Sequence, residues 1–266
     1  MIVQHNIQSM NANRQLGIGT NALAKSTEKL ASGYRINRAA DDAAGLAISE
    51  KMRSQVRGLK RASDNAQDGI SLIQTAEGMM DQQHAILQRA RELAVQAGNE
   101  TNTTQDVGAI NTELTQLKQE FERIGTSTTF NGKAISSFNN KKLQVGANAG
   151  GDNVIQISLA SNTMSDVTNL SDNTSAQTAI TNLDNDIKTL STNRATLGAQ
   201  QNRLEYTIKN DDNAAENMQA AESQIRDVDM ADEMTTYSKN NIIQQAATSM
   251  LAHANQSTQG ALSLLQ

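Results

Sequence analysis

The chain has 266 residues, of which 37% are hydrophobic and 2% aromatic, and its net charge is −5. Without cysteine it forms no disulfide or thiolate metal site, and without a basic block or aromatic-rich stretch it has no predicted nucleic-acid surface. It also lacks proline, where an average usage of about 5% would supply roughly a dozen. Because an interior proline costs a helix about 3 kcal/mol, this absence favours long, uninterrupted helices.

The first predicted helix covers residues 7–30, with leucines at seven-residue spacing on one face. Gly33 then ends it. The polar stretch 35–42 lacks a stripe and is interpreted as a connector, with Asp41 or Asp42 capping the next helix. The leucines of the stripe are Leu16, Leu23 and Leu30.

The second predicted helix, residues 43–97, carries the strongest repeat in the chain. Apolar residues lie at heptad spacing, and small residues follow three positions after most of them, which allows another helix to approach closely. At 1.5 Å per residue this helix is about 80 Å long. The heptad positions are Met52, Leu59, Ala66, Ile73, Met80, Leu87 and Ala94.

A third helix is predicted over residues 106–124, with Gly125 as its C-cap. Its expected partner is the second helix. Apolar residues follow the three- and four-residue spacing of a helix with one buried face. They are Val107, Ile110, Leu114, Leu117, Phe121 and Ile124.

The pattern then changes to that of strands and loops. The Asn131–Gly132 dipeptide is typical of a tight turn. Alternating apolar residues in 143–145 and 155–159 predict the two strands of a hairpin. The segment 161–175 is rich in Ser, Thr, Asn and Asp, so it is expected to be an exposed loop.

Two further helices complete the chain. The fourth starts near Thr174, which forms a capping-box pattern with Gln177, and its stripe keeps a three-four spacing from residue 180 to 225. The fifth is predicted over residues 230–265. The stripe of the fourth includes Leu183, Ile187, Leu190, Leu197, Leu204 and Asp211, and that of the fifth includes Ile243, Ala247, Met250, Leu251, Ala254, Leu262 and Leu265.

Together these elements predict a mainly α fold: a long antiparallel helical coiled coil or bundle rod, with a small β-hairpin region and paired N- and C-termini. Apolar residues of the second, third and fourth helices form its expected core seam. They are Met52, Leu59, Ile73, Met80, Leu87, Leu114, Leu117, Phe121, Leu183, Ile187, Leu190, Leu197 and Leu204.

The terminal helices pose a separate problem. A lone helix pair buries one face of each partner, yet the last helix carries apolar residues beside its stripe, among them Ile242, Leu251 and Leu262. Such a surface is too apolar to remain in water. Either the pair docks on the rest of the rod, or the ends of identical chains pack on one another in a polymer.

No residues predict an enzyme, a cofactor site or a metal site. His5, His84 and His253 are far apart and lack acidic or cysteine partners at ligand spacing. Asp211–Asp212 is interpreted as a solvated helix face, although Asp211 falls on the stripe. The N-terminus lacks the basic and apolar regions of a signal peptide, and no run approaches the ~20 apolar residues of a membrane span.

Several motifs near both ends closely resemble those of bacterial flagellins. The match covers residues 1–160 and about 177–266. The motifs are LASGYRINRAADDAAGLAI (30–48), NAQDGIS (65–71), QTAEG (74–78), LQRARELAVQ (87–96), FNG (130–132), LGAQQNRL (197–204) and MLAHANQ (250–256).

This resemblance implies a domain organisation. Residues 1–42 would be the N-terminal helix and connector of the inner tube (D0), and residues 230–266 its C-terminal helix. Residues 43–176 and 177–229 would form the surrounding layer (D1), and the short segment 161–173 leaves no room for outer domains. The inner-tube contacts would be made by the leucines of residues 7–30 together with Ile243, Ala247, Met250, Leu251, Ala254, Leu262 and Leu265.

The resemblance also implies partners. The chain would polymerise with itself, leave the cell through the flagellar export apparatus without a cleaved signal peptide, and reside in the extracellular filament. An export chaperone would bind the C-terminal helix, and cap and hook-junction proteins would contact the polymer. A vertebrate Toll-like receptor would contact Leu87, Arg89, Leu93 and Glu113.

Many flagellins have proline where this chain has Thr258, so the resemblance does not extend to a kink of the last helix at this position.

Two alternatives to a filament subunit stay open from the sequence. A hook–filament junction protein shares similar ends. A chemoreceptor-type signalling hairpin also has long heptads rich in Ala and Gln, but would need membrane spans or a sensing domain.

Overall fold

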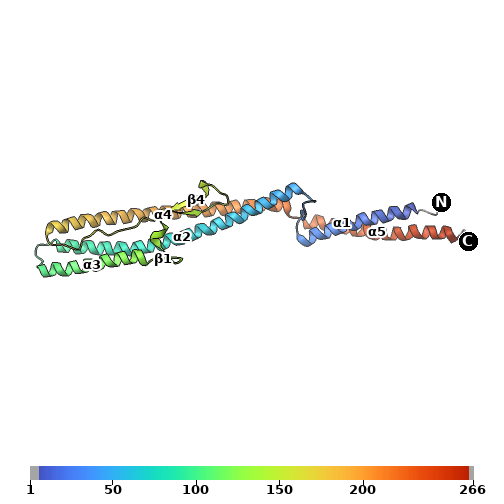
Figure 1. Cartoon of the computed structure of the whole chain (residues 1–266). Helices are drawn as coiled ribbons and strands as arrows, with labels where there is room; N and C mark the ends of the chain where they lie inside the picture. Colours follow the sequence, from blue (N-terminus) through green and yellow to red (C-terminus); the bar gives the residue numbers. More distant parts are fainter. Residues whose placement is uncertain (1–5, 264–266) are drawn as a thin grey trace. The chain divides into compact units, whose positions relative to one another are not determined.

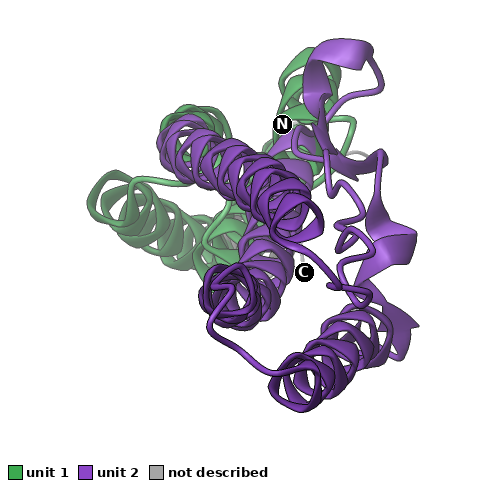
Figure 2. Ribbon diagram, turned by 90° about the vertical axis from the view of Figure 1, so that its left-hand side faces the viewer, with its two compact units in different colours: residues 1–54, 217–266 green, residues 55–216 purple. Residues whose placement is uncertain are grey.

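The computed structural model describes residues 6–263, and the surroundings of side chains as far as residue 256. The fold is mainly α, with two small antiparallel strand pairs, as predicted. The chain forms two compact units: residues 1–54 with 217–266, and residues 55–216 (Figure 2). Helices α2 (Ala43–Ala97) and α4 (Asn173–Arg226) each contribute to both units.

The first unit pairs the two ends of the chain. Helix α1 (Ile7–Ser32) begins after Asn6, whose side chain accepts a hydrogen bond from the Ser9 N–H at 3.0 Å, and it ends at Gly33 in the left-handed region. Helix α5 (Met230–Ser263) lies antiparallel beside it (Figure 1). Asn6 Nδ2 donates to the Ala254 carbonyl at one end of the pair. The predicted pairing of the termini is confirmed.

The connector after α1 also belongs to this unit. Asp42 Oδ1 accepts from the Gly45 N–H at 2.8 Å, so Asp42 caps α2, one of the two predicted candidates. The connector is tied to the end of α4: the Arg35 N–H donates to the Arg226 carbonyl at 2.7 Å. The Arg226 guanidinium lies 4.8 Å from the ring centre of Tyr34 and 2.6 Å from Glu50.

In the second unit α2 packs against α3 (Thr104–Ser127) and α4, both antiparallel to it. Arg89 of α2 pairs with Glu113 of α3 at 2.9 Å, and Gln83 donates to the Phe121 carbonyl farther along. Toward α4, Arg91 pairs with Asp184 at 2.6 Å. As residue numbers fall along α2, those of its contacts on α3 and α4 rise.

Gly125 is not the C-cap of α3, which corrects the prediction. The helix continues through it to Ser127. A Cβ at position 125 would lie 3.2 Å from Gln83 Nε2, so this glycine permits close approach to α2. At its other end the helix starts with a capping box formed by Thr103 and Asp106.

Two hairpin-like pairs follow. Strands β1 (Thr129–Phe130) and β2 (Lys133–Ala134) are joined through Asn131 and Gly132, which both have positive φ, so the predicted tight turn is confirmed. Strand β3 (Lys141–Gln144) pairs with β4 (Val154–Ile157), as predicted, with Leu143 opposite Ile155. These strands end one or two residues earlier than their apolar alternation suggested.

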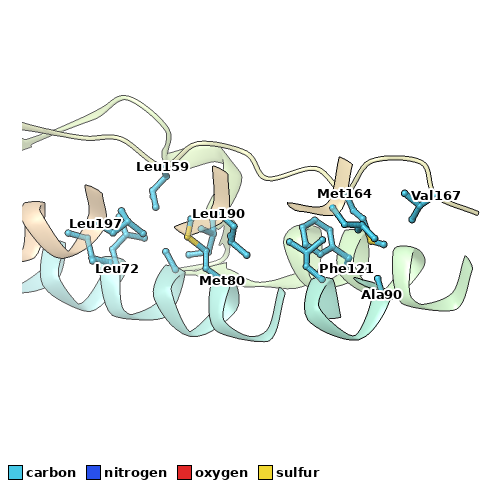
Figure 3. Close-up of a cluster of buried hydrophobic side chains, with 14 of the residues drawn as sticks. Leu72, Met80, Ala90, Phe121, Leu159, Met164, Val167, Leu190 and Leu197 are labelled. Carbon is cyan, nitrogen blue, oxygen red and sulfur yellow. The ribbon is translucent and has the colours of Figure 1, made fainter. Parts of the chain in front are cut away.

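The segment predicted to be an exposed loop is instead part of the core. Residues 158–172, which we call the strap, have no regular structure, but Leu159, Met164, Val167 and Leu170 are buried. Figure 3 shows Leu159, Met164 and Val167 turned toward the helices, with Met164 beside Phe121. Side chains of the neighbouring helices bond its backbone, Asp186 of α4 at Ser165 and Asn111 of α3 at Leu170. The polar residues between the buried ones are exposed or half-buried, which is why the composition resembled that of a loop.

The start of α4 also differs from the prediction. Thr174 and Gln177 form no capping box, because the helix already begins at Asn173. The Ser175 hydroxyl accepts from the Ser171 and Asp172 N–H groups, at 3.1 and 3.0 Å, and so closes this end.

Candidate functional site

Within residues 6–263, no three His, Cys, Asp or Glu side chains gather where they could hold a metal ion. No helix in that range is long and apolar enough to cross a membrane. The unusual surface is an apolar one, on α1 and α5.

The α1–α5 pair covers little of its own apolar surface. Helix α1 buries only Gly19 and Ser26 among residues 7–32, and no side chain of α5 between residues 230 and 256 is buried. Ile242 is 67% exposed and Met250 63% exposed, although both are large and apolar. Other large apolar side chains left exposed on these two helices are Ile7, Met10, Ile18, Met230, Met234 and Ile243.

These exposed side chains form a surface that we call the apolar end surface, and two open depressions lie on it. One of about 560 Å³ lies between the helices, where Ala12 and Gln15 of α1 face Ala247 and Met250 of α5. The other, of about 640 Å³, lies on α5 around Met234, Ile242 and Ile243, with Lys239 at its edge. The surface is therefore apolar and hollowed, as is a surface that receives side chains from another protein.

The predicted inner-tube residues divide between the helix pair and the solvent. Leu16, Leu23, Leu30, Ala247, Leu251 and Ala254 are half-buried. Ile243 and Met250 are exposed. The side chain of Leu262 and the whole of Leu265 lie outside the described residues. The predicted stripes did not include Ile7, Met10, Ile18 and Met234, which are also exposed. They could have been found from the sequence because each terminal helix is apolar on more than one face.

The predicted seam residues lie mostly in the second unit. Met52 belongs to the first unit instead, where it is half-buried. Leu117 and Ile187 are also half-buried, at the edge of the core. The others are buried: Leu59, Ile73, Met80, Leu87, Leu114, Phe121, Leu183, Leu190, Leu197 and Leu204.

The four residues suggested as a receptor contact differ in accessibility. Leu87 and Leu93 are buried in the core of the second unit. Arg89 and Glu113 are exposed and bonded to each other, and Arg89 also pairs with Glu92 at 3.2 Å. Hydrogen bonds to Glu113 and Glu92 raise the pKa of the Arg89 guanidinium above its ordinary value. A partner of this region would meet a charged surface rather than the two leucines.

Asp211 is where the sequence interpretation fails most clearly. It was expected on a solvated face, but it is 5% exposed, and its Oδ2 atom is covered and has no hydrogen-bond partner among residues 6–263. Burial raises the pKa of the Asp211 carboxyl, and the neighbouring charge of Asp212 raises that pKa further.

Long packed helices and an apolar surface left uncovered on the paired ends are typical of structural proteins that assemble with copies of themselves. Residues 3–141 match the bacterial flagellin N-terminal helical region, and residues 180–265 match the bacterial flagellin C-terminal helical region. The chain belongs to the bacterial flagellin family, whose members are structural proteins rather than enzymes.

Two flagellins that are similar over their whole length agree with this assignment. The chain is 54% identical to a flagellin of Halalkalibacterium halodurans and 47% identical to a flagellin of Bacillus subtilis, in each case over 100% of both chains. A crystal structure of Bacillus cereus flagellin is 31% identical and matches with a TM-score of 0.47, covering 56% of this chain and 88% of that one.

Proposed function

We propose that this chain is the structural subunit of an extracellular bacterial flagellar filament, and that the apolar end surface of α1 and α5 is where copies pack on one another. The observation that carries the proposal is the exposure of Ile242, Met250 and their neighbours on a helix pair that is otherwise well formed. Of the two possibilities that the sequence left open, packing between copies accounts for a surface that the pair itself leaves uncovered.

Burial of apolar surface is the main driving force of protein association, and a stable interface buries about 800 Å² on each partner. Contacts that join different surfaces of identical copies need not close into a ring, and then generate an open helical polymer.

The domain organisation belongs to the proposal as well. Residues 1–42 and 230–266 would form the inner tube, and residues 43–176 and 177–229 the surrounding layer. The compact units divide α2 and α4 farther along, at 54 and 216. The proposed inner-tube boundaries fall instead at helix ends, where α2 begins at Ala43 and α5 begins at Met230.

The remaining partners follow from the family and from the same surface. An export chaperone would cover the apolar face of α5 before assembly, and cap and hook-junction proteins would bind the polymer ends. Export through the flagellar apparatus would need no cleaved signal peptide. A vertebrate Toll-like receptor would contact the charged patch of Arg89 and Glu113, and purified monomer that fails to activate receptor-bearing reporter cells would refute that contact.

The test of the main proposal is the double substitution Ile242→Gln and Met250→Gln. Both side chains are exposed in the monomer, so the variant should keep its helical content and unfolding midpoint, while the concentration needed for filaments rises at least tenfold. Val95→Gln is the matched control, because Val95 is a similarly exposed apolar residue on α2. Negative-stain microscopy and sedimentation measure the outcome. Normal filaments from the double variant at wild-type concentration would refute the proposal.

A further inference from the structure

The row of buried leucines along α4 is followed, at the next heptad position, by an aspartate. Leu183, Leu190, Leu197 and Leu204 lie seven residues apart, and each is at most 1% exposed. Asp211 occupies the next heptad position and is nearly as buried. Heptad positions on one face of a helix pair meet the same partner helix, so Asp211 stands where the packing calls for an apolar side chain.

The layer of α2 that faces Asp211 is apolar. A Cβ at Gly69 of α2 would lie 3.2 Å from Leu204 Cδ1, which places Gly69 opposite Leu204. Because the helices are antiparallel, one heptad farther along α4 brings Asp211 opposite the layer of Ala62. Ala62 and the preceding seam residue Leu59 are both buried and apolar.

The charged groups of α2 near this layer are exposed, whereas Asp211 is buried. On α2 they are Lys60, Arg61 and Asp64, all exposed, and Arg61 pairs with Asp64 at 3.6 Å. On the far side, Asp152 of the short helix η2 (Gly151–Asn153) lines the same open cavity of about 600 Å³ as Asp211. That carboxylate adds negative charge to the site.

The charges on α4 itself do not neutralise Asp211 either. Asp212 is exposed and of the same sign. Lys209 is exposed and lies 5.7 Å from the ring centre of Tyr206. Arg203 lines the cavity two turns away and forms no ion pair with Asp211 in the part of the chain that the structure describes.

An ionised carboxylate in such surroundings is costly, since its Oδ2 atom loses water without gaining a hydrogen bond from the described residues. The neutral acid costs much less. The helix pair therefore packs best around Asp211 when the carboxyl carries a proton, and the open cavity beside it gives water a short route to the charged form.

We propose that Asp211 is a proton-controlled weak point in the seam between α2 and α4. When the carboxyl is protonated the seam stays closed, and when it ionises the stretch of α4 around residues 204–216 opens more often to hydrate the charge. This behaviour belongs to the single chain and does not depend on assembly.

The experiment is amide hydrogen exchange, read by mass spectrometry, on the full chain kept monomeric by dilution, between pH 4 and pH 8. After correction for the pH dependence of intrinsic exchange, opening of residues 204–216 should increase as pH rises. The increase is at most tenfold per pH unit and confined to the window between the ordinary Asp pKa and the raised one. Protection of the α3 core around Phe121 should not follow it.

Three variants isolate the carboxyl. Asp211→Leu and Asp211→Asn should both abolish the pH-dependent opening, and Asp211→Leu should also raise the unfolding midpoint most strongly at high pH. Asp212→Asn, the exposed neighbour, should keep the pH-dependent opening. Parallel pH profiles for wild type and both Asp211 variants would overturn the proposal, as would loss of the dependence in Asp212→Asn alone.

Discussion

The side chain of Asn111 on α3 holds Leu170 of the strap by both of its backbone groups. The Leu170 N–H donates to Asn111 Oδ1, and Asn111 Nδ2 donates to the Leu170 carbonyl, both at 3.0 Å. The same strap is held again at Ser165, whose N–H donates to Asp186 of α4 at 2.7 Å. A segment without regular structure is thus fastened to two helices by side chains that imitate a strand partner.

Replacing Asn111 with alanine should loosen the strap. Two hydrogen bonds are lost and two backbone groups of Leu170 are left unpaired, so the free energy of unfolding of the second unit should fall by about 1–3 kcal/mol. Urea unfolding measures this, and limited proteolysis should cut first within residues 158–172. Asn185→Ala on the exposed face of α4 is the control for helix propensity. Equal stability of the two variants would contradict the role of Asn111 in holding the strap.

Two glycines inside α2 should respond in opposite directions to alanine. A Cβ at Gly69 would overlap Leu143 Cδ1 of the β3–β4 pair and approach Leu204, whereas a Cβ at Gly78 would meet nothing within 4 Å. Gly78→Ala should stabilise the protein by about 0.5–1 kcal/mol through helix propensity. Gly69→Ala should destabilise it by about 1–3 kcal/mol through overpacking. Thermal and urea unfolding of the two variants measure these changes in the free energy of unfolding. If Gly69→Ala were stabilised, β3 would have to move freely on α2.

The start of α3 should weaken in acid. The Asp106 carboxylate accepts from the Thr103 N–H and hydroxyl at 2.9 and 2.6 Å, and these bonds lower the pKa of Asp106. A lowered native pKa means that the stabilisation is complete above the ordinary Asp pKa and is lost as pH falls through the lower value. Titration of Asp106 followed by NMR should therefore give a midpoint below that of an unstructured Asp, and Asp106→Asn should remove the acid-dependent loss of protection at residues 104–107. A midpoint at or above the ordinary value would contradict the capping interaction.

Removal of residues 232–266 distinguishes a filament subunit from a signalling hairpin. The truncation deletes nearly all of α5 and with it half of the apolar end surface. The shortened chain should stay monomeric by sedimentation and form no tubes at concentrations where the full chain assembles. A signalling module built on the long helices of the second unit would associate much as before.

Helices and turns followed from local pattern, because their causes lie within a few residues of one another. The absence of proline and the heptads of residues 43–97 predicted α2 with the bounds that the structure has. The Asn131–Gly132 dipeptide predicted the tight turn between β1 and β2, because both residues tolerate positive φ. The motifs near both ends likewise indicate the flagellin family from the sequence alone.

What the sequence by itself determined was therefore the main helices and turns, the antiparallel pairing of the chain ends and the apolar faces of the terminal helices. Only the tertiary structure decided which polar-looking segments are covered: the strap, Gly125 against Gln83, and Asp211 in the leucine seam. The physical reason is that periodicity reports the face of one element, while burial depends on what other elements place against that face.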